Sequence, residues 1–173
     1  MANTYKLIAS NTLTSATATV TFSSISTSYT DLNLVLSTRA SSSSWGTEVY
    51  LRFNSNSSSI YSYVAVGASN AAAFDAQLFL QNLGAGSLTA GNSSTSNAFG
   101  FTQFYIPSYQ SSSNKVFSIY DSPGFNSVTN MQFEYISNLF GSTSAISSIT
   151  IGLVNGSNFL TNSSFYLYGI SNT

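Results

Sequence analysis

The regular alternation of apolar and polar side chains constrains the fold of this chain more than any other feature. In residues 16–22 two alanines, a valine and a phenylalanine alternate with three threonines. The same spacing recurs at Leu32, Leu34 and Leu36, and again at residues 49–53. A period of two residues is typical of a β-strand, because successive side chains of a strand point to opposite faces of the sheet. We therefore expect strands with one buried face.

Similar patterns, rich in β-branched and aromatic residues, indicate more strands. They lie at residues 5–9, 60–66, 99–106, 115–120, 131–140, 148–154 and 164–170. Clusters of Ser, Asn and Gly separate them. About ten strands at this spacing predict a single all-β domain over residues 1–173, a sandwich or a barrel with little or no helix. Residues 69–84 fit either a short helix, with Ser69 as N-cap and Gly84 after its end, or a loop followed by a strand at 77–80; we favour the strand.

The composition excludes several functions. The chain has no His and no Cys, and only 5% of its residues are charged. We therefore expect no metal site, no cofactor and no His- or Cys-based catalysis. Four basic residues are too few for binding nucleic acid. No apolar run is long enough for membrane insertion, and the first residues do not resemble a secretory signal. A net charge of −1 gives little repulsion between copies, which favours association.

The acidic residues do not indicate an enzyme. The five carboxylates are Asp31, Glu48, Asp75, Asp121 and Glu134. No spacing among them singles out a pair for glycoside hydrolysis. Glu48 and Glu134 are expected on the polar faces of their strands, where they would pair with Arg39 or Arg52. The prediction is a protein without a catalytic residue.

Tyrosine and tryptophan residues are the candidates for contact with a partner, because their rings are apolar and their tips polar. Two pairs, each on one face of a strand, are expected to point outward. The candidate contact residues are Trp45, Tyr61, Tyr63, Tyr109, Tyr166 and Tyr168. Trp45 and Tyr109 lie in polar loops, at 41–46 and 108–114. The alternatives for Trp45 are a subunit contact, a contact with a carbohydrate or receptor, and a partly buried anchor of its own loop.

Both ends of the chain resemble small virion proteins of tailed bacteriophages. The resemblance lies in residues 4–13, 20–25, 29–32 and 164–172, in that order along the chain. Where such proteins are similar to characterised ones, these are jelly-roll β-sandwich modules of tail fibres, fibre tips and capsid decorations. The resemblance implies a jelly roll that forms a homo-oligomer, with a trimer favoured. It supplies no catalytic motif.

The sequence thus predicts a non-enzymatic protein of the virion surface, made in the host cytoplasm and released by lysis. We favour a tail-fibre or tip component in host adhesion, whose partners are other virion proteins and a glycan or protein of the host surface. A capsid decoration protein is the alternative placement. Two other functions stay open. A carbohydrate-binding or carbohydrate-active β-sandwich would need two close carboxylates in a groove or a platform of exposed aromatic rings. A filament or matrix subunit would associate in an open, head-to-tail manner.

Overall fold

The chain is built from β-strands alone in the parts that the structure describes. The computed structural model describes residues 4–69, 73–122 and 132–171, and in these ranges it contains twelve strands and no helix. The strands are β1 (Tyr5–Thr12), β2 (Thr19–Phe22), β3 (Asp31–Thr38), β4 (Gly46–Phe53), β5 (Tyr61–Ser69), β6 (Ala73–Gln81), β7 (Gly84–Ala90), β8 (Gly100–Ile106), β9 (Lys115–Ser122), β10 (Gln132–Phe140), β11 (Ile149–Leu153) and β12 (Ser164–Ile170). None of the described elements is a helix that could cross a membrane.

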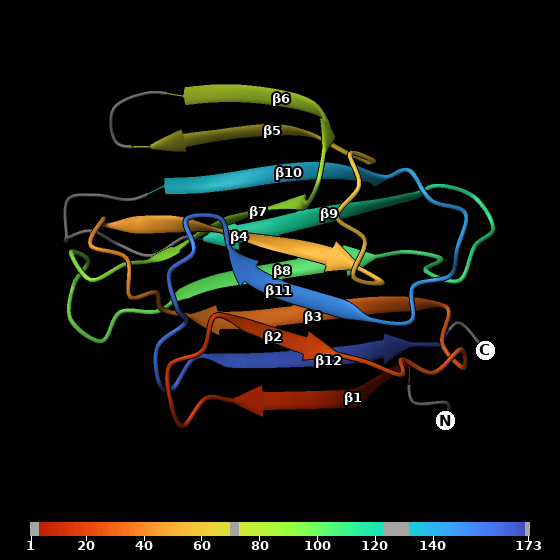
Figure 1. The fold of residues 1–173 in the computed structure, drawn as a ribbon, viewed down its shortest axis with the longest axis horizontal. Coiled ribbons are helices and arrows are strands. Elements are labelled where there is room, and N and C mark those ends of the chain that lie inside the picture. The colour runs from red at the N-terminus through yellow and green to blue at the C-terminus, as the bar shows by residue number, and fades with distance from the viewer. Residues whose placement is uncertain (1–3, 70–72, 123–131, 172–173) are drawn as a thin grey trace.

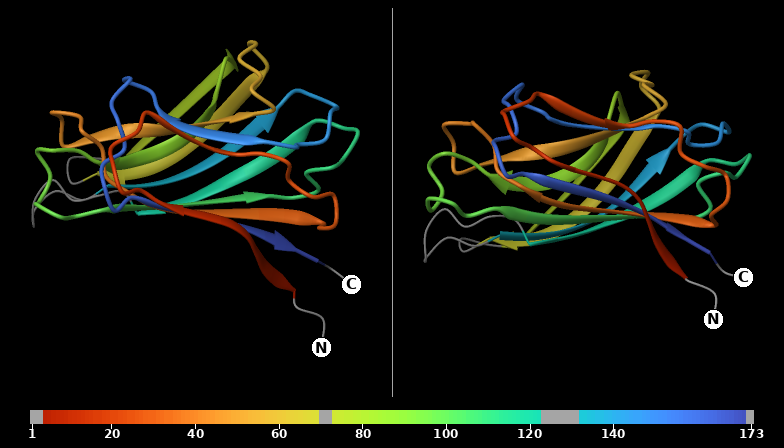
Figure 2. Two further views of the ribbon diagram at one scale, coloured as in Figure 1. Left: turned by 60° about the horizontal axis from the view of Figure 1, so that its bottom comes forward. Right: turned by 90° about the horizontal axis from the view of Figure 1, so that it is seen from below.

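The strands form two antiparallel sheets that lie one on the other (Figures 1 and 2). The larger sheet has the order β1-β12-β3-β8-β9-β10-β5-β6, and the smaller sheet has the order β2-β11-β4-β7. Without β5, β6, β9 and β10, two four-stranded sheets remain, β1-β12-β3-β8 and β2-β11-β4-β7. Consecutive strands of this set alternate between the sheets, except that β4 and β7 are neighbours in the smaller sheet, and this is the order of a jelly roll. The predicted all-β sandwich of jelly-roll type is confirmed.

The four additional strands extend only one of the two sheets. They continue the larger sheet past β8, in the order β9-β10-β5-β6. Figure 1 shows β5 and β6 beyond the edge of the smaller sheet, with β6 outermost. The larger sheet is therefore wider than the layer that covers it.

The core lies between the sheets and follows the alternation in the sequence. Leu32, Leu34 and Leu36 of β3 are fully buried, as are Val49, Leu51 and Phe53 of β4. Both sets were predicted to face the core, and both predictions are confirmed. Their neighbours in sequence point away from the core, as the period of a strand requires.

A cluster of aromatic rings joins the smaller sheet to the extension of the larger one. Phe53 comes from β4, and its ring lies 5.0 Å from Phe117 of β9 and 5.3 Å from Phe140 of β10, centroid to centroid. Tyr61 of β5 stacks on Phe140 at 4.9 Å. Ring contacts of this kind add to the energy gained by burial alone. The cluster holds the added strands against the sandwich.

Two buried cations fasten loops to the sandwich through backbone oxygens. The Arg39 guanidinium donates to the carbonyls of Thr95 and Ala98, each at 2.8 Å. The Lys115 ammonium donates to the carbonyls of Ser142 and Ser144, at 2.9 and 2.6 Å. Both side chains are buried. Burial lowers the pKa of Lys115, because a charge is less stable away from water.

Residues 69–84 contain no helix where the structure describes them. β5 ends at Ser69, β6 runs from Ala73 to Gln81 and β7 begins at Gly84; residues 70–72 lie outside the described ranges. The strand favoured at 77–80 is confirmed, and it is longer than predicted.

The strand β7 has no counterpart among the predicted strands. It passes so close to its neighbours that glycine is needed: a Cβ on Gly86 would lie 2.4 Å from the Val49 carbonyl oxygen, and one on Gly84 would lie 2.6 Å from the Phe117 ring. A segment rich in glycine and other small residues is usually predicted to be a turn. In β7 the small residues instead allow close packing against the neighbouring strands.

Candidate functional site

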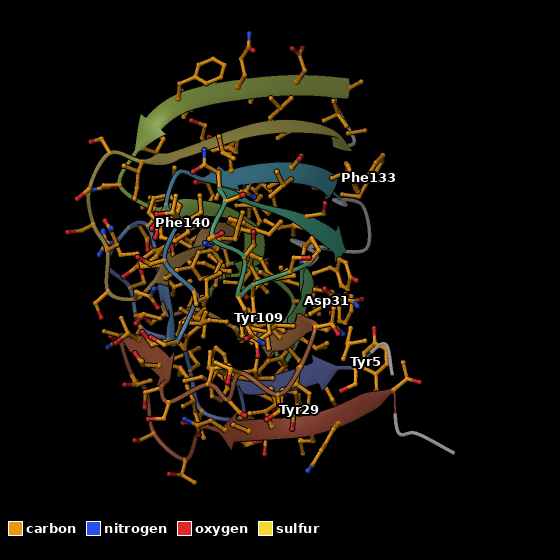
Figure 3. All side chains as sticks on the ribbon, turned by 90° about the vertical axis from the view of Figure 1, so that its right-hand side faces the viewer. Tyr5, Tyr29, Asp31, Tyr109, Phe133 and Phe140 are labelled. Atoms are coloured by element: carbon orange, nitrogen blue, oxygen red, sulfur yellow. The ribbon has the colours of Figure 1, made fainter. Side chains whose placement is uncertain are left out.

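The main candidate site is the surface of the larger sheet that points away from the smaller one, which we call the outer face. Twelve large apolar side chains of the described residues are exposed, and all but Leu78 and Val154 lie on this face. The ten are Tyr5, Leu7, Val64, Val66, Phe79, Phe101, Val116, Phe133, Tyr135 and Leu139. Figure 3 places Tyr5 and Phe133 on this side of the molecule, away from the core residue Phe140. The apolar side chains therefore span the sheet from β1 to β6.

The outer face is almost free of charge. Its charged groups among the described side chains are Asp31 at one end of β3 and Asp75 on β6, and no Lys or Arg side chain points from it. The Asp31 carboxylate is buried and accepts bonds from the Tyr105 hydroxyl and the Ser108 N–H, both at 2.7 Å. The bond to Asp31 raises the pKa of Tyr105 to about 12, since it stabilises the protonated hydroxyl. A face with many exposed apolar side chains and few charges is typical of a surface that another protein covers.

The outer face also contains a shallow hollow of about 340 Å³ over β5, β6, β9 and β10. Its apolar lining comes from Val64, Phe79, Val116 and Leu139. Phe79 is 62% exposed and stands at the rim nearest the end of the sheet. A hollow with such a lining fits an apolar side chain of a partner better than a charged or strongly hydrated ligand.

The exposed surface of the smaller sheet has the opposite character. The hydroxyls of Thr21 and Thr150 bond to each other across β2 and β11 at 3.0 Å. On β4 the Arg52 guanidinium lies 5.0 Å from the centre of the Tyr50 ring. Hydroxyl groups and a charge keep this surface compatible with water, so the two surfaces of the sandwich differ in what they can contact.

The structure places Tyr166 and Tyr168 of β12 on the outer face, as predicted. Both are half-buried among their neighbours in the sheet. The Tyr168 ring packs edge-on against the Tyr5 ring at 6.4 Å. These two tyrosines belong to the apolar surface described above, and their contact with a partner stays a prediction.

Tyr61 and Tyr63 point to the opposite side from the one predicted. Tyr61 is fully buried, and its hydroxyl accepts a bond from the Phe53 N–H at 3.0 Å. Tyr63 is half-buried and points to the same side as Tyr61, whereas Val64 and Val66 are exposed on the outer face. The prediction assumed that the valines face the core. It is wrong because both sides of β5 are apolar, so that alternation alone does not tell which one is buried.

Tyr109 is also buried and cannot contact a partner, contrary to prediction. Its ring is in the core, and its hydroxyl donates to the Ser26 carbonyl. The amide of the next residue, Gln110, donates to the Thr27 and Tyr29 carbonyls at 2.6 Å each. Tyr109 and Gln110 thus fasten the loop of residues 26–29 to the sandwich, a role for which the sequence gives no local signal.

Trp45 is half-buried in the loop that precedes β4. Its carbonyl accepts bonds from the Gly91 N–H at 2.8 Å and from the Ser94 hydroxyl. These bonds fix the backbone of the loop, and they do not involve the indole ring. The predicted partner contact of Trp45 stays a prediction.

A second, smaller pocket brings two carboxylates together. Glu48 of β4 and Glu134 of β10 line it with Tyr63 and the bulge at Gly86. Burial and then the charge of Glu134 raise the pKa of Glu48, and burial followed by both carboxylates raises the pKa of Tyr63. The Glu48 side chain is nevertheless exposed to solvent. The pocket offers hydroxyl and carboxyl groups to a polar ligand.

The arginines expected to pair with these carboxylates bind backbone oxygens. Arg39 binds the carbonyls already described, and the Arg52 Nε donates to the Asn82 carbonyl at 3.1 Å. Glu134 accepts a bond from the Gln132 amide at 2.7 Å. Both arginines thus hold loops through backbone oxygens, a role that the sequence analysis did not predict.

In the described ranges, no three acidic side chains come together in a way that could hold a metal ion. Comparisons with protein-family models, with curated proteins and with solved structures gave no match to this chain.

Proposed function

We propose that this chain is a non-enzymatic structural protein of the bacteriophage virion surface, which assembles as a homo-oligomer through the outer face. The observation that carries the proposal is the concentration of ten of the twelve exposed large apolar side chains on that one face. A monomer that exposed such a surface would be prone to aggregate. The resemblance of both chain ends to phage virion proteins supplies the virion as the setting.

A second copy of the chain is the partner that the charges favour. The outer face has almost no charge, so two outer faces can approach without repulsion between like charges. With a net charge of −1, the whole molecule adds little long-range repulsion. The trimer favoured by the resemblance is part of the proposal.

The proposal is tested by measuring the molar mass in solution by light scattering over a range of concentrations. The variant Val116→Asp places a charge in the hollow of the outer face and is expected to weaken self-association about 30-fold, equivalent to about 2 kcal/mol. Thr19→Asp adds the same charge on the exposed surface of the smaller sheet and is expected to leave association unchanged. A monomer at all concentrations, or equal effects of the two variants, would contradict the proposal.

Within the virion we propose a place in the tail fibre or its tip, where the protein contributes to host adhesion. The polar loops at the ends of the sandwich offer adaptable contacts to a glycan or protein of the host surface. Gold-labelled antibodies viewed on phage particles test the placement. Label at the distal tail is the expected result, label over the head would make the chain a capsid decoration protein, and unlabelled particles with an accessible epitope would exclude the virion surface.

The pocket between Glu48 and Glu134 supports a second candidate, a carbohydrate-binding β-sandwich. Its carboxyl and hydroxyl groups can bond to the hydroxyls of a sugar, and Tyr63 offers a ring beside them. The test is binding to a glycan array by the natural chain and by Glu48→Gln, which keeps the shape of the side chain and removes its charge. Binding that Glu48→Gln abolishes, with an unchanged molar mass, would favour this candidate; equal binding by both proteins would reject the pocket.

A further inference from the structure

The strand β6 is an open edge of the larger sheet. It is the last strand in the sheet order and pairs only with β5, so that no strand of the described residues lies on the other side of its backbone. It is nine residues long, and every one of its side chains from Asp75 to Phe79 is exposed. Exposure on both faces means that the smaller sheet does not cover β6, which lies beyond the edge of that sheet in Figure 1.

Edge strands of soluble proteins are usually protected against pairing with other chains. The common devices are a lysine or proline in the strand, a short strand length, a β-bulge, or a covering loop. β6 has a bulge between Leu78 and Gln81, and its pairing with β5 is regular from Ala73 to Leu78. β6 contains no proline and no basic residue, and its single charge is Asp75. Leu78 on one face and Phe79 on the other are large, apolar and exposed. The edge therefore has the length and the composition of a strand that pairs with another strand.

We propose that β6 pairs antiparallel with β6 of a second copy, around a two-fold axis at Gln77. This inference rests on the proposed homo-oligomer and specifies one of its contacts. A two-fold axis at Gln77 places each residue i from Asp75 to Phe79 opposite residue 154 − i of the partner copy, so that Gln77 lies opposite its own copy, Leu78 opposite Ala76, and Asp75 opposite Phe79. The register of β6 shifts at a β-bulge between Leu78 and Gln81, and the proposed pairing does not extend through it.

The side chains of β6 match one another in this register. Leu78 and Ala76 form two large–small pairs on the side of the strand that faces the smaller sheet, which lets the side chains pack without a clash. On the outer face the two Gln77 amides meet, and each can donate to and accept from the other. Directly opposed side chains of an antiparallel pair are close enough for such contacts to contribute to pairing.

The charge on β6 also favours a second copy in this register. Asp75 lies opposite Phe79, and the two Asp75 residues are about 14 Å apart along the strands, four residues at about 3.4 Å each. An axis at Ala76 would bring the two carboxylates to diagonal positions, and an axis at Leu78 would oppose two leucines. The axis at Gln77 avoids both the repulsion between the two carboxylates and the crowding of the two leucines.

The contact would join the two larger sheets into one continuous sheet. Both outer faces would then lie on the same side and form one apolar surface of twice the width. A two-fold contact makes dimers, so in a trimeric assembly it would link one trimer to the next. The contact at β6 and the contact of the outer face are thus compatible.

Cysteine cross-linking tests the register directly, because the natural chain has no cysteine. Gln77→Cys would place two thiols directly opposite each other across the axis, and a short thiol–thiol linker is expected to convert the protein to a covalent dimer. Ala73→Cys is the matched control on the same face of β6. Its two thiols would be about 27 Å apart and are expected to stay unlinked.

A mixture of Asp75→Cys and Phe79→Cys chains is expected to form the mixed dimer, because these positions face each other across the proposed axis. Light scattering on the same samples separates the two proposals. Association without cross-linking at position 77, or with equal cross-linking at 73 and 77, would overturn the β6 contact and leave the outer-face assembly standing. A protein that is monomeric at all concentrations would overturn both.

Discussion

The substitution Tyr61→Phe measures whether β5 has the orientation that the structure gives it. The Tyr61 hydroxyl accepts a bond from the Phe53 N–H at 3.0 Å and donates to the Asn56 carbonyl at 3.3 Å. Phenylalanine keeps the ring on Phe140 and removes both bonds. The Phe53 N–H is then left buried without this partner, which costs about 1–3 kcal/mol. We expect the free energy of unfolding to fall by about 2 kcal/mol.

The assay is equilibrium unfolding in urea at a fixed protein concentration. With a denaturant slope of about 2 kcal/mol per molar, the midpoint is expected to fall by about 1 M. Tyr166→Phe on the outer face is the control, and its effect is expected to stay within about 0.5 kcal/mol. If Tyr61→Phe lowered the free energy of unfolding as little as this control, the Tyr61 hydroxyl would be in water. The orientation of β5 that the sequence pattern suggested would then be correct.

Three further predictions concern stability. Leu34→Ala removes a fully buried side chain from the centre of β3 and is expected to cost about 2–5 kcal/mol in the same urea assay; a cost below about 1 kcal/mol would contradict its place in the core. The pKa values of Tyr61 and Tyr105 are raised to about 12 in the folded protein, whereas tyrosine in the unfolded chain has a pKa near 10. The unfolded chain therefore releases these protons first, and the stability that they contribute is expected to be complete below pH 10 and to be lost as the pH rises towards 12. A free energy of unfolding that does not change with pH in this range would refute the raised pKa values. Gly86→Ala forces a Cβ against the Val49 carbonyl oxygen and is expected to lower the melting temperature by several degrees, whereas an unchanged melting temperature would show that β7 can move away.

The sequence pattern predicts the fold well where the two faces of a strand differ in polarity. In β3 the leucines alternate with polar residues and a single valine, and in β4 apolar residues alternate with Glu48, Tyr50 and Arg52, so the buried side is evident. The jelly-roll order was implied by the resemblance of the chain ends, and the strand order confirms it.

The candidate site was only partly predictable, for physical reasons that β5 and β7 illustrate. In β5 both faces are apolar, because one lies over the core and the other is part of the outer face. The pattern of polarity therefore cannot show which of the two faces is buried. In β7 small residues are required because the strand packs closely against other strands. The residues that it packs against, such as Val49 and Phe117, are far away in the sequence. The outer face is a property of strands brought together by the topology, so no single segment reveals it.

The carbonyl cages around Arg39 and Lys115 have a consequence for the conditions that this protein can tolerate. Most buried cations are held by carboxylates, which acid neutralises and which salt can screen when they are near the surface. Peptide carbonyls do not titrate, and the two cationic side chains are themselves buried. The loops at 94–98 and 142–144 should therefore keep their anchors in dilute acid and in brine.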